Sequence, residues 1–380
     1  MAHATTPRGR GRARPALYPV MLTDAPAKPV LWTPRHVLVT ASAQAEPHGR
    51  AILDRLAAAG VEDVTLLSGD RLPPLRGDDD RATYARAKKT LAVVTSAASK
   101  RRPTPIPPSA DFSFPLAEGC PGHCQYCYLA GSLSGPPITR VYADLPRILA
   151  GLDEVVGTGG VTSGTQARGH EGTTFEASCY TDPLALEHVT GSLAATVTHF
   201  GTHEWPGPVQ LRLTTKYDDV EGLLDLPHHG RTRIRASVNV ADVERFEGGT
   251  ARVRSRLHAL GRLARAGYPV GLTIAPIMPV EDWAARYGEL LDAAAAELPA
   301  DADLTVECIT HRFTPKSKDV QLGWYPRTKL DLEESTRTRK HGKFGAVKYV
   351  YDRDTMRELR TWFEAALPQR LPAARFLYWT

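Results

Sequence analysis

The sequence has few cysteines and no long apolar run, and both shortages narrow what the chain can be. It holds 5 cysteines among 380 residues, an odd count that does not describe a secreted disulfide scaffold. No apolar stretch approaches the roughly 18 residues needed to span a bilayer. The basic N-terminus, MAHATTPRGRGRARP, has no apolar signal core. We therefore expect a protein of the reducing cytoplasm with no membrane partner.

A strong charge of one sign is also missing. The net charge is +5, which favours nucleic acid as a partner only weakly. The positive charge is nevertheless patchy, with arginine and lysine gathered in residues 8–14, 85–103, 252–265 and 336–343. For any one patch, a solvated helix face explains the charge as well as a nucleic-acid contact does.

The chain divides into three parts by composition. Residues 1–30 are rich in proline, arginine and small residues without periodicity, which predicts a disordered basic tail. Apolar patterns predict a strand at 36–41, a helix at 49–60 and a strand at 63–68, so the start of the chain forms a small β-α-β unit. The proline-rich stretch RRPTPIPPS ends this unit, and we place an N-terminal α/β unit at 31–105.

Strand and helix patterns alternate through the third part, residues 106–380. Predicted strands lie at 112–117, 173–178, 209–215, 232–239, 270–276 and 303–309. Amphipathic helical stretches lie between them, at 144–155, 183–199, 218–225, 250–267 and 281–297. Six such repeats predict an α/β fold with a partial (β/α)6 TIM-like barrel. Chemistry in such barrels lies at the carboxyl ends of the strands.

Three of the five cysteines stand in one short loop, EGCPGHCQYCYLA, directly after the first predicted barrel strand. Thiolates ligate soft metals, and three of them on an iron–sulfur cubane leave one iron open for another molecule. The metal ligands would be Cys120, Cys124 and Cys127. Zinc is an alternative, with His123 or Cys308 as a fourth ligand. Thiol redox chemistry would need only the last two cysteines of the loop.

The C-x3-C-x2-C spacing resembles that of the radical S-adenosylmethionine (SAM) enzymes. Wider segments, among them AEGCPGHCQYCYL, FEASCYTDPLALEHVTG and TTKYDDVEGLLDLPHHGRTRIRASVN, resemble the spore photoproduct lyase family, from about residue 32 to the C-terminus. The resemblance implies a radical SAM barrel with a [4Fe-4S] cluster and S-adenosyl-L-methionine as cofactors. It also implies a DNA-repair lyase that uses a 5′-deoxyadenosyl radical to convert the UV-induced spore photoproduct, 5-thyminyl-5,6-dihydrothymine, to two thymines.

The resemblance also implies roles for residues outside the metal site. Cys179, in the ASC word, would donate a hydrogen atom to the thymine product radical, whereas its position alone favours a buried, inert cysteine. Tyr126 and Tyr128 would relay a radical between this cysteine and the cosubstrate, or simply pack around the cluster. The residues implied to contact the cosubstrate are Lys216, Ser237, Thr181 and Asn239. We expect serine in the family at the position of this threonine, a change that keeps the hydroxyl.

The implied partners are UV-damaged DNA, with the thymine lesion flipped out, and an electron donor such as flavodoxin or ferredoxin. We expect a monomer, in the cytoplasm or in the spore core if the source organism sporulates. The segment TRKHGKFGAVKYVY resembles the lesion-contacting region, but it has Lys343 and Phe344 where arginine and tyrosine are expected. These differences and the loop at 157–172 motivate an alternative, a relative that acts on another nucleic-acid lesion or on a non-DNA molecule. A zinc-bound nucleic-acid module without enzymatic activity is a third hypothesis.

Overall fold

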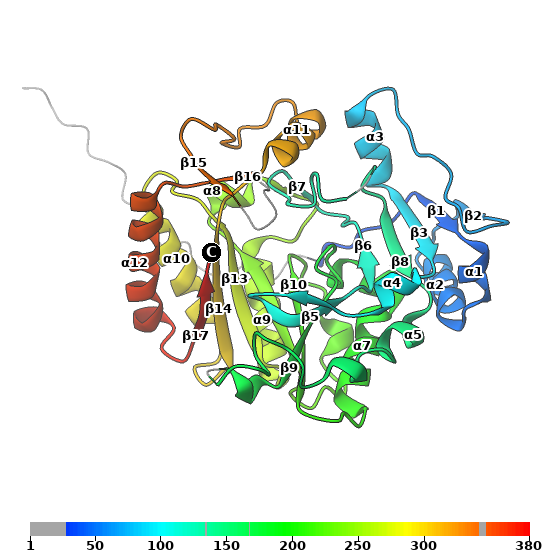
Figure 1. Cartoon of the computed structure of the whole chain (residues 1–380), viewed down its shortest axis with the longest axis horizontal. Coiled ribbons are helices and arrows are strands. Elements are labelled where there is room, and N and C mark those ends of the chain that lie inside the picture. Colours follow the sequence, from blue (N-terminus) through cyan, green and yellow to red (C-terminus); the bar gives the residue numbers. More distant parts are fainter. Residues whose placement is uncertain (1–27, 134, 167, 342–346) are drawn as a thin grey trace, which may run out of the picture.

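The computed structural model describes residues 28–133, 135–166, 168–341 and 347–380. Two large sheets, two two-stranded sheets and their helices make up this part of the chain, with the largest sheet curled at the centre and the five-stranded one beside it (Figure 1). Of the predicted basic tail, residues 1–27 lie outside the described residues, as do Lys343 and Phe344. No helix in the described ranges is long and apolar enough to cross a membrane.

The larger sheet has eight strands among the described residues, in the order β17-β14-β13-β11-β10-β9-β5-β4. The six predicted barrel strands are confirmed as its parallel centre, and the partial barrel is thereby confirmed. Their bounds are β5 Ala110–Phe114, β9 Thr173–Ala177, β10 Val209–Thr215, β11 Thr232–Val238, β13 Val270–Ile277 and β14 Leu304–Thr310. Two strands were not predicted, namely β17 (Arg375–Trp379), parallel to β14, and β4 (Thr104–Ile106), antiparallel to β5.

Helices cover the outer face of this sheet, and apolar side chains from both layers form the core. The covering helices are α5 Leu145–Leu149, α6 Glu187–Thr190, α7 Ser192–Thr202, α9 Val253–Arg265, α10 Trp283–Glu297 and α12 Arg353–Arg370. The helix α9 shows why the sequence folds this way. Its apolar residues recur every three or four positions, and Val253, Leu257, Leu260 and Leu263 are all buried.

The smaller sheet, of five strands in the order β2-β1-β3-β8-β6, contains the predicted β-α-β unit. The bounds of its strands are β1 His36–Val39, β2 Val64–Leu66, β3 Thr90–Val94, β6 Ala117–Glu118 and β8 Thr139–Tyr142, and its helices are α1 Ala41–Ala45, α2 Pro47–Ala58, α3 Asp80–Ala87 and α4 Ala98–Arg101. Two of these strands, β6 and β8, lie beyond residue 105, so the sheet crosses the predicted domain boundary. The division into domains stays a prediction.

Charged side chains fill the inside of the barrel sheet as closed ion pairs. Arg235, at the middle of β11, pairs with Glu176 of β9 and Glu307 of β14, and all three side chains are buried. Arg212 of β10 pairs with Glu171, which belongs to the loop before β9. Because each buried charge has a partner, the interior is a packed polar core.

The loop at 157–172 closes the amino edge of the barrel. Its anchor is Asp111 of β5, whose carboxylate accepts hydrogen bonds from the backbone N–H groups of Val161, Thr162 and Ser163. The loop runs into the first residue of β9, so it lies at the end of the barrel opposite the carboxyl edge. It therefore does not line the expected site.

The carboxyl edge carries the cysteine loop and its covering elements, seen at the top of Figure 1. The short strands β7 (His123–Cys124) and β12 (Glu247–Gly248) pair there, next to α8 (Ala241–Glu244). The helix α11 (Pro315–Trp324) and the hairpin of β15 (Thr338–His341) and β16 (Val347–Val350) follow β14. Phe313, just after β14, bridges to Tyr349 of the hairpin through two backbone hydrogen bonds.

Candidate active site

The backbone of the cysteine loop is held from two sides. On one side lies the buried Lys88, at the C-terminal end of α3. Its Nζ donates hydrogen bonds to the carbonyl oxygens of Cys120 and Gly122, both at 2.5 Å. From the barrel side, β12 pairs with β7, and the N–H of Gln125 donates to the carbonyl oxygen of Phe246 at 2.9 Å. All three loop cysteines are half-buried and free of disulfides.

The chemistry of these thiols suits a metal cluster. Burial raises the pKa of Cys120 to about 12, and burial also raises the pKa of Cys124 above its ordinary value. Thiolates at such positions need a cation beside them, which a bound iron cluster provides. The three thiols therefore fit the [4Fe-4S] cluster that the spacing predicts.

The zinc alternative loses its candidate fourth ligands. Cys308 is fully buried in the apolar core, on β14. His123 has its Nδ1 at 3.3 Å from the hydroxyl of Tyr84 and its ring against Gly249. Across the described ranges, no three His, Cys, Asp or Glu side chains are grouped so that they could hold a single metal ion. The zinc alternative therefore has less support than a cluster held by the three loop cysteines.

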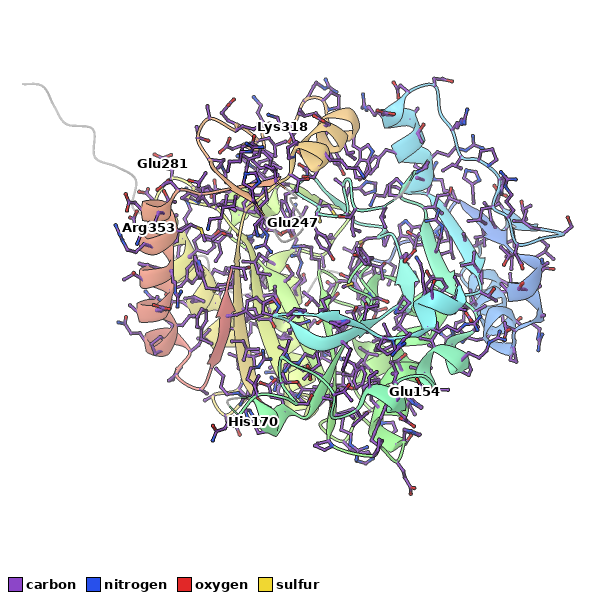
Figure 2. The ribbon with its side chains drawn as sticks, in the orientation of Figure 1. Glu154, His170, Glu247, Glu281, Lys318 and Arg353 are labelled. Atoms are coloured by element: carbon purple, nitrogen blue, oxygen red, sulfur yellow. The ribbon has the colours of Figure 1, made fainter. Side chains whose placement is uncertain are left out.

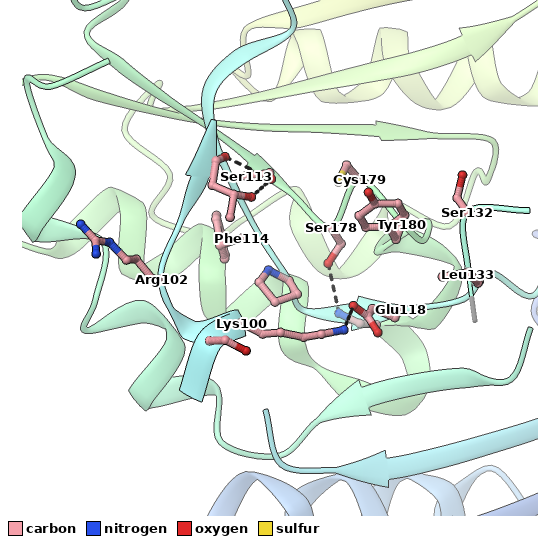
Figure 3. Close-up of a pocket in the computed structure, with 14 residues that line it drawn as sticks. Lys100, Arg102, Ser113, Phe114, Glu118, Ser132, Leu133, Ser178, Cys179 and Tyr180 are labelled. Carbon is pink, nitrogen blue, oxygen red and sulfur yellow. Dashed lines mark hydrogen bonds and ion pairs between the residues drawn. The ribbon is translucent and has the colours of Figure 1, made fainter. Parts of the chain in front are cut away.

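Cys179 lines a cavity of about 340 Å³ between the two sheets, together with Ser178 and Tyr180 (Figure 3). The strand β9 ends at Ala177, and Ser178 then turns with φ 56°, a left-handed conformation that directs the next residue out of the strand. The hydroxyl of Ser178 fixes the turn by accepting the N–H of Leu116 at 2.5 Å.

The thiol of Cys179 stays protonated at neutral pH. Burial raises its pKa to about 11, although a hydrogen bond from Ser113 opposes this rise. A hydrogen-atom donor must carry its S–H hydrogen, so this environment suits the role predicted for the residue. Across the cavity Lys100 forms an ion pair with Glu118 (Figure 3).

The two predicted tyrosines occupy different surroundings. The hydroxyl of Tyr128 donates a hydrogen bond to the backbone carbonyl of Cys179, while its side chain is 61% exposed. The hydroxyl of Tyr126 instead donates to the carboxylate of Glu247, inside the fold. Burial raises the pKa of Tyr126 well above the ordinary value, and at neutral pH both phenols keep their O–H hydrogen.

Lys216 and Ser237 meet at the carboxyl ends of β10 and β11. The Nζ of Lys216 donates to Ser237 Oγ at 2.9 Å, to Glu247 Oε1 at 2.7 Å and to the hydroxyl of Tyr126 at 3.1 Å. These contacts use all three N–H donors of the ammonium group, so a ligand carboxylate would bind by replacing one of them. The geometry thus brings together two of the four residues predicted to contact the cosubstrate.

Thr181 and Asn239 differ in whether their polar side-chain atoms already have hydrogen-bond partners. The Oγ1 of Thr181 is buried and has no hydrogen-bond partner within the described structure, as expected of a group that awaits a ligand. Asn239 is buried, and its amide donates to the carbonyl of Pro276 at 2.7 Å and accepts from the hydroxyl of Tyr287 at 3.1 Å. Its contact with the cosubstrate stays a prediction, with less geometric support than that of Thr181.

Sequence reasoning missed three residues that contact and support the site residues, namely Glu247, Arg256 and Lys88. The signal for Glu247 was the EGG word at 247–249. A Cβ at Gly249 would lie 2.9 Å from the His123 ring, and φ there is +69°, so glycine marks a close approach to the cysteine loop. Nothing in the local sequence distinguishes Arg256 or Lys88 from other basic residues.

The hairpin at the carboxyl edge carries a group of cations. All four residues of β15 are exposed, among them Arg339 and Lys340. Burial lowers the pKa of Lys348 on β16, and the nearby charges of Arg312 and Lys340 lower it further. Cations this close together form a surface suited to phosphate groups.

Comparisons with known proteins identify the family of this chain. The family model described as spore photoproduct lyase matches residues 32–380. The spore photoproduct lyase of Bacillus subtilis (strain 168) is 35% identical over 92% of this chain and 99% of its own length. That of a Geobacillus species is 36% identical over 92% of this chain and 99% of its own.

Solved structures agree over the same extent. A spore photoproduct lyase variant with bound AdoMet and dinucleoside spore photoproduct has a TM-score of 0.82 at 34% identity, covering 92% of this chain and 99% of that one. A spore photoproduct lyase complexed with dinucleoside spore photoproduct has a TM-score of 0.81 at 34% identity, with 91% and 99% covered. The resemblance predicted from the sequence is confirmed, and the chain belongs to the spore photoproduct lyase family.

Proposed function

We propose that this protein is a radical SAM lyase that reverses the spore photoproduct in UV-damaged DNA to two thymines. Family membership and the similarity to relatives solved with AdoMet and dinucleoside spore photoproduct support the proposal. One observation carries it, the hydrogen bond from Tyr128 to the carbonyl of Cys179. This contact joins the loop of the three metal-binding thiols to the thiol that would finish the repair.

Cys120, Cys124 and Cys127 would hold a [4Fe-4S] cluster, with SAM bound beside it. When bound, these cofactors would supply the 5′-deoxyadenosyl radical chemistry that opens the lesion. The protein's part is to bind and orient. Lys216 and Ser237 would hold the ligand carboxylate from the strand ends.

Cys179 completes the repair by giving its S–H hydrogen atom to the thymine radical left after the lesion opens. The thiol becomes a thiyl radical in this step, and the thymine becomes a closed-shell product. Tyr128 stands next to this cysteine and restores the thiol by giving up its phenolic hydrogen. Tyr126, on the side of Lys216, then restores Tyr128 and is itself restored from 5′-deoxyadenosine, so hydrogen atoms balance over the cycle.

The basic hairpin would hold DNA by its phosphates, so that the lesion can leave the stack and enter the cavity. A distorted lesion costs less to flip out than a normal base pair. Phosphate contacts would provide most of the affinity and make it salt-dependent. The edge of the cavity offers further cations, since Lys100 and Arg102 line it.

Three further features belong to the proposal. An electron donor such as flavodoxin or ferredoxin would reduce the cluster. The protein would act as a monomer, in the cytoplasm or in the spore core if the source organism sporulates. The alternative substrate gains no support from the loop at 157–172, which closes the amino edge of the barrel, and Lys343 and Phe344 lie outside the described residues.

The test is reconstitution of the cluster under anaerobic conditions, followed by incubation with SAM, reductant and synthetic lesion DNA. We expect loss of the lesion with formation of thymine, and no reaction in a Cys127→Ala variant. SAM cleavage without any loss of the lesion would instead point to another substrate. Titrating the protein with DNA at several salt concentrations, with and without the lesion, distinguishes repair of the spore photoproduct from action on another substrate by binding alone.

A further inference from the structure

A buried carboxylate that the proposed mechanism does not use lies directly behind the cysteine loop. Glu247 has a fully buried side chain, and in Figure 2 it is drawn inside the fold, at the level of the carboxyl edge. Its Oε1 accepts from Lys216 Nζ at 2.7 Å and from the hydroxyl of Tyr126. Its Oε2 lies 2.6 Å from Nη2 of Arg256.

The backbone ties this carboxylate to the metal-binding loop. In the β7–β12 pair, Glu247 stands opposite Cys124 and Gly248 stands opposite His123. Both glycines of the EGG word allow this approach, because a Cβ at either would crowd His123. Any shift of β12 therefore moves the cysteine loop with it, and the carboxylate keeps a fixed place relative to the loop.

Two cations hold Glu247 in place. Lys216 Nζ lies 2.7 Å from its Oε1, and Arg256 Nη2 lies 2.6 Å from its Oε2. Arg256 is itself locked, since it also donates to the carbonyl oxygens of Ala251 and Ser237 at 2.8 Å each. The carboxylate is thus clamped against a rigid partner on one side and presents its other oxygen to the site.

Tyr126 depends on that oxygen for its orientation. Its other polar neighbour is the ammonium group of Lys216, which donates and cannot accept the phenolic hydrogen. Within the described structure, the carboxylate of Glu247 is the acceptor that the phenol uses. Without it the buried O–H would have no acceptor there, and the ring would turn to find one.

We propose that Glu247 is a positioning residue for Tyr126, fixing the phenol at the distance from Tyr128 and the cosubstrate that hydrogen-atom transfer requires. The inference rests on the proposed function, in which Tyr126 is the second relay. Glu247 gains and loses nothing in the cycle. Its effect is geometric, and a displacement of about 1 Å between reacting groups can cost about 100-fold in rate.

The first measurement reads the position of the ring without any turnover. 3-Fluorotyrosine placed at 126 in the diamagnetic, cluster-loaded protein reports its surroundings through the ¹⁹F resonance. We expect Glu247→Gln to shift or broaden this resonance, because the amide N–H group would face Arg256 and the phenol would lose its charged acceptor. The matched control is Glu244→Gln, three residues earlier, whose carboxylate binds the N–H of Val253 instead. An unchanged resonance in Glu247→Gln would overturn the proposal.

The second measurement counts SAM consumed per lesion repaired. A working relay recovers the cosubstrate, so the parent enzyme should consume less than one SAM per repair, and Glu247→Gln should raise the ratio severalfold toward one. Tyr126→Phe should raise it equally, and the double variant no further, because both act through one group. If Tyr126→Phe raises the ratio and Glu247→Gln does not, the positioning role is wrong.

The two measurements together separate this inference from the proposed function. If the fluorine resonance moves while Tyr126→Phe leaves the ratio unchanged, Glu247 does position the ring and the relay part of the proposed function fails.

Discussion

At the scale of single residues, protonation decides which side chains can carry hydrogen atoms. Burial holds Cys179 and Tyr126 in their neutral forms, and the exposed Tyr128 is neutral at pH 7 as an ordinary phenol. A thiolate or phenolate would have no hydrogen atom to give. The loop cysteines also sit at buried positions, but there a metal cluster takes the place of the proton.

Cys179 gives the first prediction. Cys179→Ala should still start the reaction but should divert the thymine radical to side products, since no S–H hydrogen remains nearby. Product analysis by mass spectrometry measures the ratio of thymine to side products. If the variant forms thymine as cleanly as the parent enzyme, Cys179 is not the donor.

The same residue gives a pH dependence. With its pKa at about 11, above the ordinary value of 9.0, the thiol form persists well past neutrality. The fraction of clean thymine product should therefore stay flat from neutral pH to about pH 10 and fall only above that. A fall centred at the ordinary value would contradict the burial of this thiol.

Lys216 gives a prediction on binding. Removing a charged hydrogen-bond donor costs about 1.5–3 kcal/mol, so Lys216→Ala should weaken SAM binding by roughly tenfold or more. Equilibrium titration of the cluster-loaded protein measures this without turnover. Lys318→Ala on α11 is a suitable control, because that lysine pairs with Glu334 on the surface. Equal affinities in the two variants would remove Lys216 from the cosubstrate site.

At the scale of elements, the sequence predicted the barrel strands well and their neighbours poorly. The six central strands are short stretches in which apolar residues alternate with polar ones, separated by helical periods, and local composition reveals this pattern. The strands β6 and β8 were missed because β8 is placed by pairing with β3 and β6 by pairing with β8, contacts between distant segments that no local pattern shows. Glu247 was missed for the same reason, since its partners come from three other elements.

The anchored loop at 157–172 gives a prediction on stability. Asp111→Ala would remove an acceptor from the buried N–H groups of Thr162 and Thr174, and we expect a loss of about 3 kcal/mol in the free energy of unfolding. Denaturant unfolding measures this, with Asp111→Asn as the milder change because it keeps one oxygen. Asp225→Ala, at an exposed site, should be nearly neutral. A neutral Asp111→Ala would mean that the loop is held by other contacts.

The hairpin gives a prediction on DNA. Lys340→Ala should weaken binding to lesion and undamaged DNA alike, and should lower the slope of log affinity against log salt by about 1. Arg357→Ala on α12, which covers the outer face of the barrel, is the control. Salt slopes equal to the parent's in Lys340→Ala would exclude the hairpin as a phosphate contact.

At the scale of the whole molecule, the two sheets meet around the cysteine loop. Lys88 reaches the loop from the smaller sheet, and β12 reaches it from the barrel. Ion pairs fill the inside of the barrel, and the loop at 157–172 covers its amino edge. The carboxyl edge is therefore the end of the barrel where a substrate can bind. The family resemblance was predictable from the sequence because its motifs are contiguous words, whereas the buried scaffold behind them is assembled from distant segments.

The content of metal and sulfide in anaerobically prepared protein tests the central claim most directly. A cubane on Cys120, Cys124 and Cys127 predicts a brown protein with about four iron and four sulfide per chain, lost when any of the three is changed to alanine. A colourless protein that binds zinc in place of iron would contradict the account.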